Sequence, residues 1–263
     1  MTPTSRRSSS PNSRRPRRPQ ALRGLLLAAL WWVGPVCAYD GLCPGEWDRA
    51  RDTRQRIEQE WPLRSSGDEA TQFIQALGVK LARYSAGGSG IPWRFAVVRN
   101  LAPNAFSIGA GYVYITEGAV TFAQSESELA AIIAHELGHQ LAGHFCSQAT
   151  YADSGGLFDI FSAAQPPPDR HVVGAGSVRQ TIDPRKEEQA DQIAVSILQA
   201  AGYEPRALLQ VARRLPTGGE AHLQDPRRIQ ALERMVAAYR DAPAGPDSAA
   251  FKEVRRALAG DAR

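Results

Sequence analysis

The stretch AIIAHELGHQLAGHF, residues 131–145, constrains the fold more than any other part of the sequence. It contains the pattern HExxH, in which His135 and His139 stand four residues apart and Glu136 follows the first histidine. On a helix this spacing places both imidazoles on one face, one turn apart, at a reach that suits a single zinc ion. A helix alone supplies two ligands, so the chain must fold in a way that brings a third ligand to this face.

Further metal ligands from the same helix are limited by its periodicity. A metzincin pattern would require Gly at position 142 and His at position 145, where this chain has Ala142 and Phe145. His144 lies nine residues after His135, which is the opposite face of a continuous helix. We therefore expect His144 to be a residue at the helix end that shares the metal only if the helix breaks at Gly143.

A second helix offers a carboxylate. The segment DPRKEEQADQIAVSILQAAG, residues 183–202, has an aspartate as its N-cap, proline at its first position and glycine after its end. Glu187 and Asp191 stand four residues apart and project to one side, so Glu187 would complete the ligand set and leave the fourth position to water. Asp191 would accept the free ring N–H of a ligand histidine. Glu188 is the alternative ligand, and acidic residues in a first turn also favour the helix dipole without binding metal.

The other elements follow from apolar periodicity. It predicts five further helices, at about 46–61, 68–85, 205–215, 226–240 and 248–259. Alternation predicts one strand within 93–100 and two within 104–118 that turn at 109–111. Ser125 and Glu128 form a predicted capping box for the HExxH helix, which should run to about Phe145. The elements predict one α+β domain, mainly helical with a small sheet.

Residues 1–38 have the composition of an export signal. They hold seven arginines and no acidic residue, then an apolar run of 13 residues and the sequence VCA ending at Ala38. The apolar run is shorter than the roughly 20 residues of a bilayer span. We predict a signal peptide over 1–38 and an exported domain over 39–263, periplasmic or in the cell envelope. A leader that is not cleaved would instead associate the protein with the membrane.

The compartment and the charge bear on possible partners. From residue 39 onward the chain has 24 basic and 27 acidic residues, a net charge of −3, so nucleic acid is not a predicted partner. In an oxidising compartment Cys43 and Cys146 could form a disulfide, and the alternative is two unpaired small apolar side chains. Residues 147–182, between the two site helices, lack a clear pattern and are expected to be a lid-like loop or disordered.

Taken together, these motifs resemble one family. From about residue 68 to 240 the chain resembles the HtpX-like and CAAX-prenyl-protease-like zinc metalloendopeptidases, the gluzincins of peptidase family M48. HELGHQLAGH is similar to the zinc helix of that family, RKEEQAD to its E-x-x-A-D segment, and NAFSIGAGYVYITEGAV to its edge strand and turn. HLQDPRRI resembles its late His-Pro element, with His222 and Arg228, although Leu223 stands where the family usually has proline. The export signal points to the soluble periplasmic branch.

The resemblance implies a zincin-like metallopeptidase domain in which an edge strand of the sheet lines the active-site cleft. It assigns one Zn²⁺ per chain to His135, His139 and Glu187. It also assigns Asp191 as the carboxylate behind a ligand histidine. Zinc would polarise a water molecule and lower its pKa.

The expected mechanism is hydrolysis of peptide bonds. Glu136 would take a proton from the water and pass it to the leaving amine. His222 and Arg228, by resemblance, would stabilise the developing oxyanion, or else be a satisfied histidine and an interhelix salt bridge. Asn104 and Ala105 would line the cleft and pair with an extended substrate backbone.

Backbone pairing of this kind is independent of sequence, so the expected substrates are unfolded or misassembled envelope proteins, in a protein quality-control role. The alternative is a chaperone-like binding factor in envelope assembly with a latent zinc site. In that case His171 or His222 would supply a fourth ligand and exclude the water.

Overall fold

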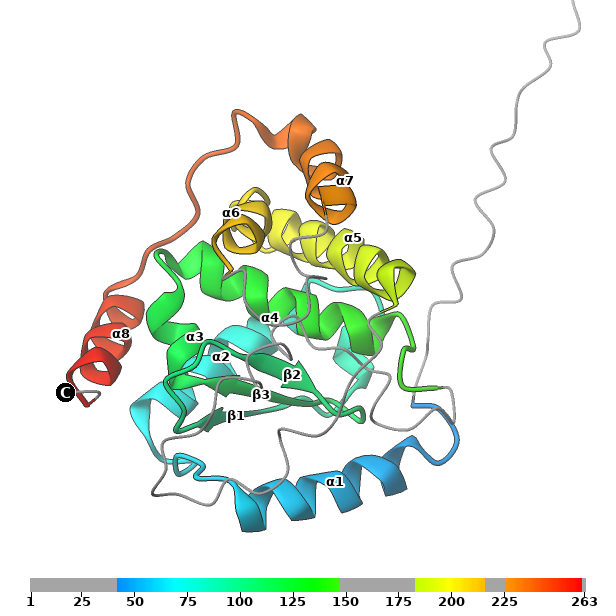
Figure 1. Cartoon of the computed structure of the whole chain (residues 1–263), viewed down its shortest axis with the longest axis vertical. Coiled ribbons are helices and arrows are strands. Elements are labelled where there is room, and N and C mark those ends of the chain that lie inside the picture. The colour runs from blue at the N-terminus through cyan, green and yellow to red at the C-terminus, as the bar shows by residue number, and fades with distance from the viewer. Residues whose placement is uncertain (1–41, 147–182, 216–225, 262–263) are drawn as a thin grey trace, which may run out of the picture. The chain divides into compact units, whose positions relative to one another are not determined.

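The computed structural model describes residues 42–146, 183–215 and 226–261, which all belong to one compact unit (Figure 1). The predicted signal peptide, the predicted lid-like loop at 147–182 and His222 lie outside the described residues. Within the described ranges, no helix has the length and apolar character needed to cross a membrane.

The described residues form a mainly helical fold with one small sheet, as predicted. The helices are α1 (Glu46–Glu60), α2 (Glu69–Arg83), α3 (Glu117–Phe122), α4 (Glu126–Leu141), α5 (Pro184–Ala200), α6 (Ala207–Arg214), α7 (Pro226–Val236) and α8 (Ala249–Asp261), with short 3-10 turns η1 (Gly88–Gly90) and η4 (Ala237–Tyr239). The sequence did not predict α3. This helix has six residues and begins directly after a strand, so it is too short to show a periodicity.

Three short strands pair into a mixed sheet. They are β1 (Arg94–Val98), β2 (Ala105–Ser107) and β3 (Tyr112–Thr116), in the order β1-β3-β2. β3 runs parallel to β1 and antiparallel to β2. The turn from β2 to β3 contains Gly109 and Gly111 with φ of 89° and 78°, a conformation that favours glycine. The order places β2 at one edge of the described sheet.

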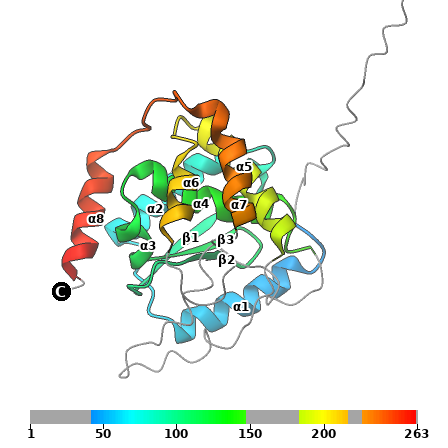
Figure 2. The ribbon, with the colours of Figure 1, turned by 45° about the horizontal axis from the view of Figure 1, so that its top comes forward.

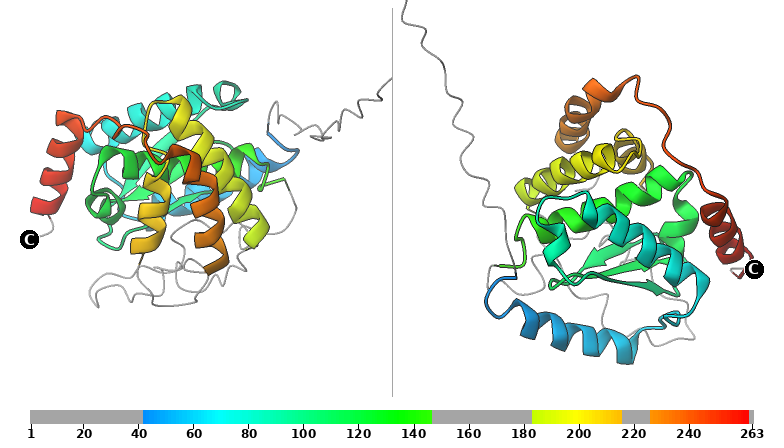
Figure 3. Two further views of the ribbon diagram at one scale, coloured as in Figure 1. Left: turned by 90° about the horizontal axis from the view of Figure 1, so that it is seen from above. Right: turned by 180° about the vertical axis from the view of Figure 1, so that it is seen from behind.

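Helices cover both faces of this sheet. Val113 and Ile115 of β3 belong to a buried apolar cluster with residues of α2 and α4. Tyr112 and Tyr114, which alternate with them, belong to a second cluster with Ile57 of α1. Figures 1 and 3 show α1 on one side of the sheet and α2 and α4 on the other. The period of two along β3 thus positions the HExxH helix against the sheet.

The helix ends show which local signals hold. Ser125 caps α4 by accepting from the Glu128 backbone N–H at 3.2 Å, as predicted. The Glu128 carboxylate accepts from Gln124 N at 2.7 Å instead of from Ser125 N, so the capping box is only half formed. α4 ends at Leu141, four residues before its predicted end. The reason is Gly143, whose φ of 69° is left-handed and stops the helix.

The helices α5, α6 and α7 stack on the side of α4 that faces away from the sheet. Figure 2 and the left view of Figure 3 show α5, α6 and α7 lying together there. Where α4 packs against α5, a Cβ added to Gly138 would lie only 2.6 Å from the carbonyl oxygen of Ala190. Glycine within HELGH therefore permits the close packing that brings α5 next to the histidines.

A disulfide joins Cys43 and Cys146, with their Cα atoms 5.1 Å apart. Beside it, the buried Glu46 carboxylate accepts from Ala110 N at 2.6 Å and from Gln140 Nε2 at 2.7 Å. The start of α1, the β2–β3 turn and the end of α4 are therefore held together by one covalent and several polar contacts.

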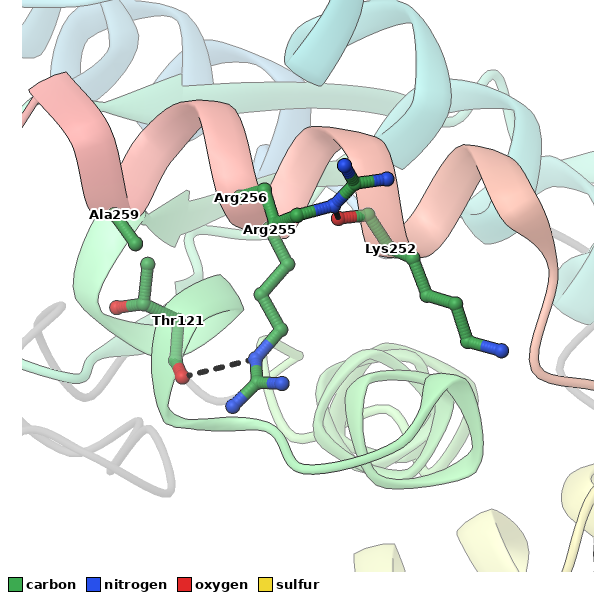
Figure 4. Close-up of a pocket in the computed structure, with 5 residues that line it drawn as sticks. All are labelled: Thr121, Lys252, Arg255, Arg256 and Ala259. Carbon is green, nitrogen blue, oxygen red and sulfur yellow. Dashed lines mark hydrogen bonds between the residues drawn. The ribbon is translucent and has the colours of Figure 1, made fainter.

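The surface of the described residues has a hollow of about 660 Å³ between α3 and α8, lined by Thr121, Lys252, Arg255, Arg256 and Ala259 (Figure 4). The Arg255 side chain spans it and donates to the Thr121 carbonyl oxygen at 3.4 Å. None of the predicted zinc ligands lines this hollow.

Candidate metal centre

Three candidate ligands from two helices meet between α4 and α5. His135 and His139 lie one turn apart on α4, and Glu187 lies in the first turn of α5. All three side chains are buried, whereas the alternative ligand Glu188 is exposed. Of the two carboxylates at the start of α5, Glu187 is the one directed inward to the histidines.

The distances among these groups fit one metal ion. The Nε2 atoms of His135 and His139 are 3.0 Å apart, and each lies 3.4 Å from a carboxylate oxygen of Glu187. Tetrahedral zinc with bonds of about 2.0–2.1 Å places its ligand atoms roughly 3.3–3.4 Å apart. Glu187 Oε2 is buried and takes part in no hydrogen bond. A buried carboxylate oxygen without such a partner can coordinate a cation. The donor set and its spacing therefore fit zinc.

Asp191 lies behind His135. Its Oδ1 is 2.9 Å from His135 Nδ1, so the carboxylate accepts a hydrogen bond from that nitrogen and leaves Nε2 for the metal. Arg228 of α7 in turn donates to both oxygens of Asp191, each at 2.9 Å. Its Nη1 lies 3.2 Å from Glu187 Oε2, without hydrogen-bond geometry. Arg228 is thus an ion-pair partner of both α5 carboxylates, an arrangement that binds α7 to the site.

His144 lies beside His139, contrary to its expected place on the opposite face of a continuous helix. After α4 ends, the left-handed Gly143 reverses the chain and His144 N donates to the His139 carbonyl oxygen at 3.1 Å. The ring nitrogens His139 Nδ1 and His144 Nδ1 are then 2.9 Å apart. His144 Nε2 lies 3.0 Å from Gln189 Oε1 of α5. Periodicity alone missed this contact, although Gly143 was the signal that could have revealed it.

Glu136 is fully buried and points toward the edge strand. Ser107 of β2 donates its hydroxyl to Glu136 Oε2 at 3.1 Å. The edge strand therefore reaches the carboxylate that the sequence predicted as the base. No sequence pattern pointed to Ser107, because a single serine within a strand carries no specific signal.

The buried groups of the site shift the pKa values of the candidate ligands in different directions. Burial alone lowers the pKa of His135, but the neighbouring carboxylates of Asp191 and Glu187 together exceed this effect and raise it to about 9. Burial lowers the pKa of His139 to about 3. Burial would raise the pKa of Glu187, yet Arg228, His139 and His135 together outweigh it and the pKa falls to about 2. Glu187 and Asp191, whose pKa is also lowered mainly by Arg228 against the effect of burial, are thus ionised at neutral pH.

The remaining predicted residues lie as follows. Asn104 directly precedes β2, and its backbone N–H donates to Thr116 Oγ1 at 2.8 Å. Ala105 begins β2 opposite Ile115 of β3. His222 is outside the described residues, so its predicted role stays a prediction.

Known proteins that are similar to this chain are named as proteases or endopeptidases. A relative from Vibrio cholerae is 32% identical over 160 residues, which are 55% of this chain and 32% of the relative. The beta-barrel assembly-enhancing protease of Escherichia coli is 27% identical over 151 residues, 52% of this chain and 31% of its own length. The mitochondrial metalloendopeptidase OMA1 of Arabidopsis thaliana is 30% identical over 155 residues, 57% of this chain and 32% of its own length.

The matched region is thus about a third of the length of each of these relatives. The family profile described as Peptidase family M48 matches residues 69–236, from the start of α2 to the end of α7, and so spans both helices that carry the candidate ligands. The chain belongs to peptidase family M48.

Proposed function

We propose that this protein is a zinc-dependent metalloendopeptidase. The observation that carries the proposal is the convergence of two imidazoles and one carboxylate at the spacing of tetrahedral zinc ligands, next to a buried glutamate. Membership in a peptidase family and relatives named as proteases agree with it. His135, His139 and Glu187 would hold one zinc ion, which when bound makes a water molecule a better nucleophile at neutral pH.

Glu136 is the proposed general base. It adjoins a ligand histidine but lies a quarter turn or so around the helix, which keeps its carboxylate out of the ligand set. Its Oε2 accepts from Ser107, and this hydrogen bond would hold the carboxylate in place between the strand and the ligands. In the proposed reaction Glu136 takes the proton of the attacking water and then delivers it to the nitrogen of the leaving amine.

We propose that β2 is the edge strand that lines the active-site cleft and binds substrate. The backbone N–H of Asn104 donates to Thr116 Oγ1, and its carbonyl oxygen accepts from Thr116 N of β3. Because successive residues of a strand point their N–H and C=O groups to opposite sides, those of Ala105 face the open edge of the described sheet. A substrate in extended conformation would add there as a further strand, two residues from the contact of Ser107 with Glu136. Backbone pairing of this type favours unfolded chains.

The proposed biological role is quality control of unfolded or misassembled proteins of the cell envelope. The name of the Escherichia coli relative, a beta-barrel assembly-enhancing protease, supports this choice of substrates. The basic and apolar leader supports export to the periplasm or envelope through a signal peptide over 1–38. His222 and Arg228 are proposed to assist the developing negative charge on the carbonyl oxygen.

The proposal is tested by the substitution Glu136→Gln in the purified, zinc-loaded protein. Glutamine keeps the size of the side chain and can still bind Ser107, but it cannot accept a proton. We expect zinc content and Tm to stay unchanged while hydrolysis of casein falls by about a hundred- to ten-thousand-fold.

A Glu136→Gln variant that cleaves casein as fast as the wild type would contradict the mechanism. If neither protein cleaves casein but both bind it, the binding-factor alternative would be the better account.

A further inference from the structure

Each of the two candidate zinc-binding imidazoles has a partner on its Nδ1 atom, and the two partners differ. His135 uses the carboxylate of Asp191, the common arrangement behind a metal-bound histidine. His139 uses a second imidazole, that of His144, at 2.9 Å. His144 is buried, with 7% of its surface exposed. Among the described residues, its contacts with α4 are this ring contact and the backbone hydrogen bond from His144 N to the His139 carbonyl oxygen.

The hydrogen bonds around His144 have a consistent direction. Zinc takes the lone pair of Nε2 of a neutral histidine, so the Nδ1 of His139 must carry the proton and donate. His144 must then accept through an unprotonated Nδ1, and its proton must sit on Nε2. The carboxamide oxygen Gln189 Oε1, which can only accept, lies 3.0 Å from that Nε2. The order of donation is therefore His139 to His144 to Gln189.

We propose that His144 is a positioning residue for the zinc ligand His139, with Gln189 fixing the ring of His144 in the accepting tautomer. The inference rests on the proposed zinc site. His144 does not bind the metal, because its Nδ1 is directed at His139 and the candidate metal-binding group that includes His139 comprises only His135, His139 and Glu187 among the described residues.

The local chain geometry is what makes this contact available. Gly143 adopts φ of 69°, and the backbone bonds Gly143 N to Gln140 O and His144 N to His139 O close the end of α4. The two rings meet edge to face, with centroids 5.0 Å apart and planes at 68°. Because Gln189 lies on α5 two residues after Glu187, the same helix supplies a metal ligand and the outer end of this chain of hydrogen bonds.

The test compares zinc dissociation constants of four variants with that of the wild type, measured by competition with a chelator. His144→Ala removes the acceptor, and we expect a dissociation constant about 10- to 100-fold higher. In His144→Asn the side-chain oxygen takes the place of Nδ1 and should keep the dissociation constant within a few-fold of wild type. Gln189→Ala should give a smaller rise than His144→Ala. Gln192→Ala, an exposed glutamine on the same helix, is the matched control and should give none.

Two further readouts separate positioning from a merely structural role. The absorption spectrum of the cobalt-substituted protein should change in His144→Ala, because the orientation of one ligand ring changes, and should be restored in His144→Asn. The Tm of the metal-free protein should differ little between these two variants.

The inference is overturned if His144→Ala binds zinc as tightly as the wild type, or if His144→Asn loses as much affinity as His144→Ala. Should the wild type itself bind no zinc, the proposed function fails and the inference fails with it. These results are distinguishable, because only the last one concerns the unsubstituted protein.

Discussion

The two histidines of HELGH illustrate how much depends on groups that never touch a metal. Asp191 and His144 each accept a hydrogen bond from the Nδ1 of one ligand, and Arg228 holds Asp191 in turn. Asp191 was predictable from the sequence because it stands one helical turn after Glu187 and carries a charge. The pairing of Arg228 with Asp191 was not, because the two residues are 37 positions apart on different helices.

The role of Arg228 can be tested with Arg228→Lys, which keeps the positive charge but cannot donate two parallel hydrogen bonds to Asp191. If the guanidinium acts by positioning Asp191, we expect zinc affinity to fall about 10- to 100-fold, as for other partners of metal ligands. Zinc competition and casein hydrolysis, measured on the same preparations, are the readouts. Unchanged zinc affinity with a lower kcat would instead favour a direct role of Arg228 in stabilising the oxyanion.

At the scale of elements, the close packing of α4 and α5 creates the metal centre. The start of α5 was predictable because an aspartate followed by a proline is a strong signal for the beginning of a helix. In the structure Asp183 caps the helix by accepting from Arg185 N, and Pro184 occupies the first turn. The end of α4 was not predicted correctly, because the apolar pattern continues beyond Gly143 while the backbone does not. Local periodicity reports which face is buried, whereas the end of a helix depends on a single left-handed residue.

Gly138 is the position where this packing can be tested. Alanine has a higher helix propensity than glycine, by about 1 kcal/mol, and on that basis alone Gly138→Ala would stabilise the protein. Its Cβ would however lie 2.6 Å from the backbone oxygen of Ala190, which cannot move aside like a flexible side chain. We expect the steric overlap to outweigh the gain in helix propensity. The free energy of unfolding should fall by about 1–3 kcal/mol, and zinc binding should become weaker.

The control is Gly90→Ala, at a glycine where an added Cβ would meet nothing within 4 Å. Denaturant unfolding and zinc competition should show little change in this variant. Equal or higher stability of Gly138→Ala, with zinc affinity retained, would refute the proposed tight contact of α4 with α5.

At the scale of the whole molecule, the sequence predicted a mainly helical fold with a small sheet, and the described residues have this class. The three strands were predictable from alternation, and their order was not, because pairing between strands depends on the connections and on what covers each face. The pairing of Cys43 with Cys146 was left open by the sequence. Their separation of 103 residues carries no local signal, and only the folded chain brings their Cα atoms to 5.1 Å.

The disulfide should make a large contribution to stability, since it closes a long loop. Replacing both cysteines with serine, Cys43→Ser with Cys146→Ser, should lower the free energy of unfolding by about 2–5 kcal/mol and Tm by roughly 4 to 20 °C. Thermal unfolding with and without reductant checks this. Reductant should lower the Tm of the wild type and leave that of the double variant unchanged. Equal Tm values for the two proteins without reductant would show that the bond does not form.

The central claim is that His135, His139 and Glu187 hold one zinc ion. The most direct measurement is the zinc content per chain of the wild type, Glu187→Ala and Glu188→Ala, purified alike and analysed by mass spectrometry of the metal. Glu187 is buried and lies 3.4 Å from both imidazoles, whereas its neighbour Glu188 is exposed. We expect about one zinc in the wild type and in Glu188→Ala, and nearly none in Glu187→Ala. Full zinc content in Glu187→Ala, or loss of zinc in Glu188→Ala, would contradict the account.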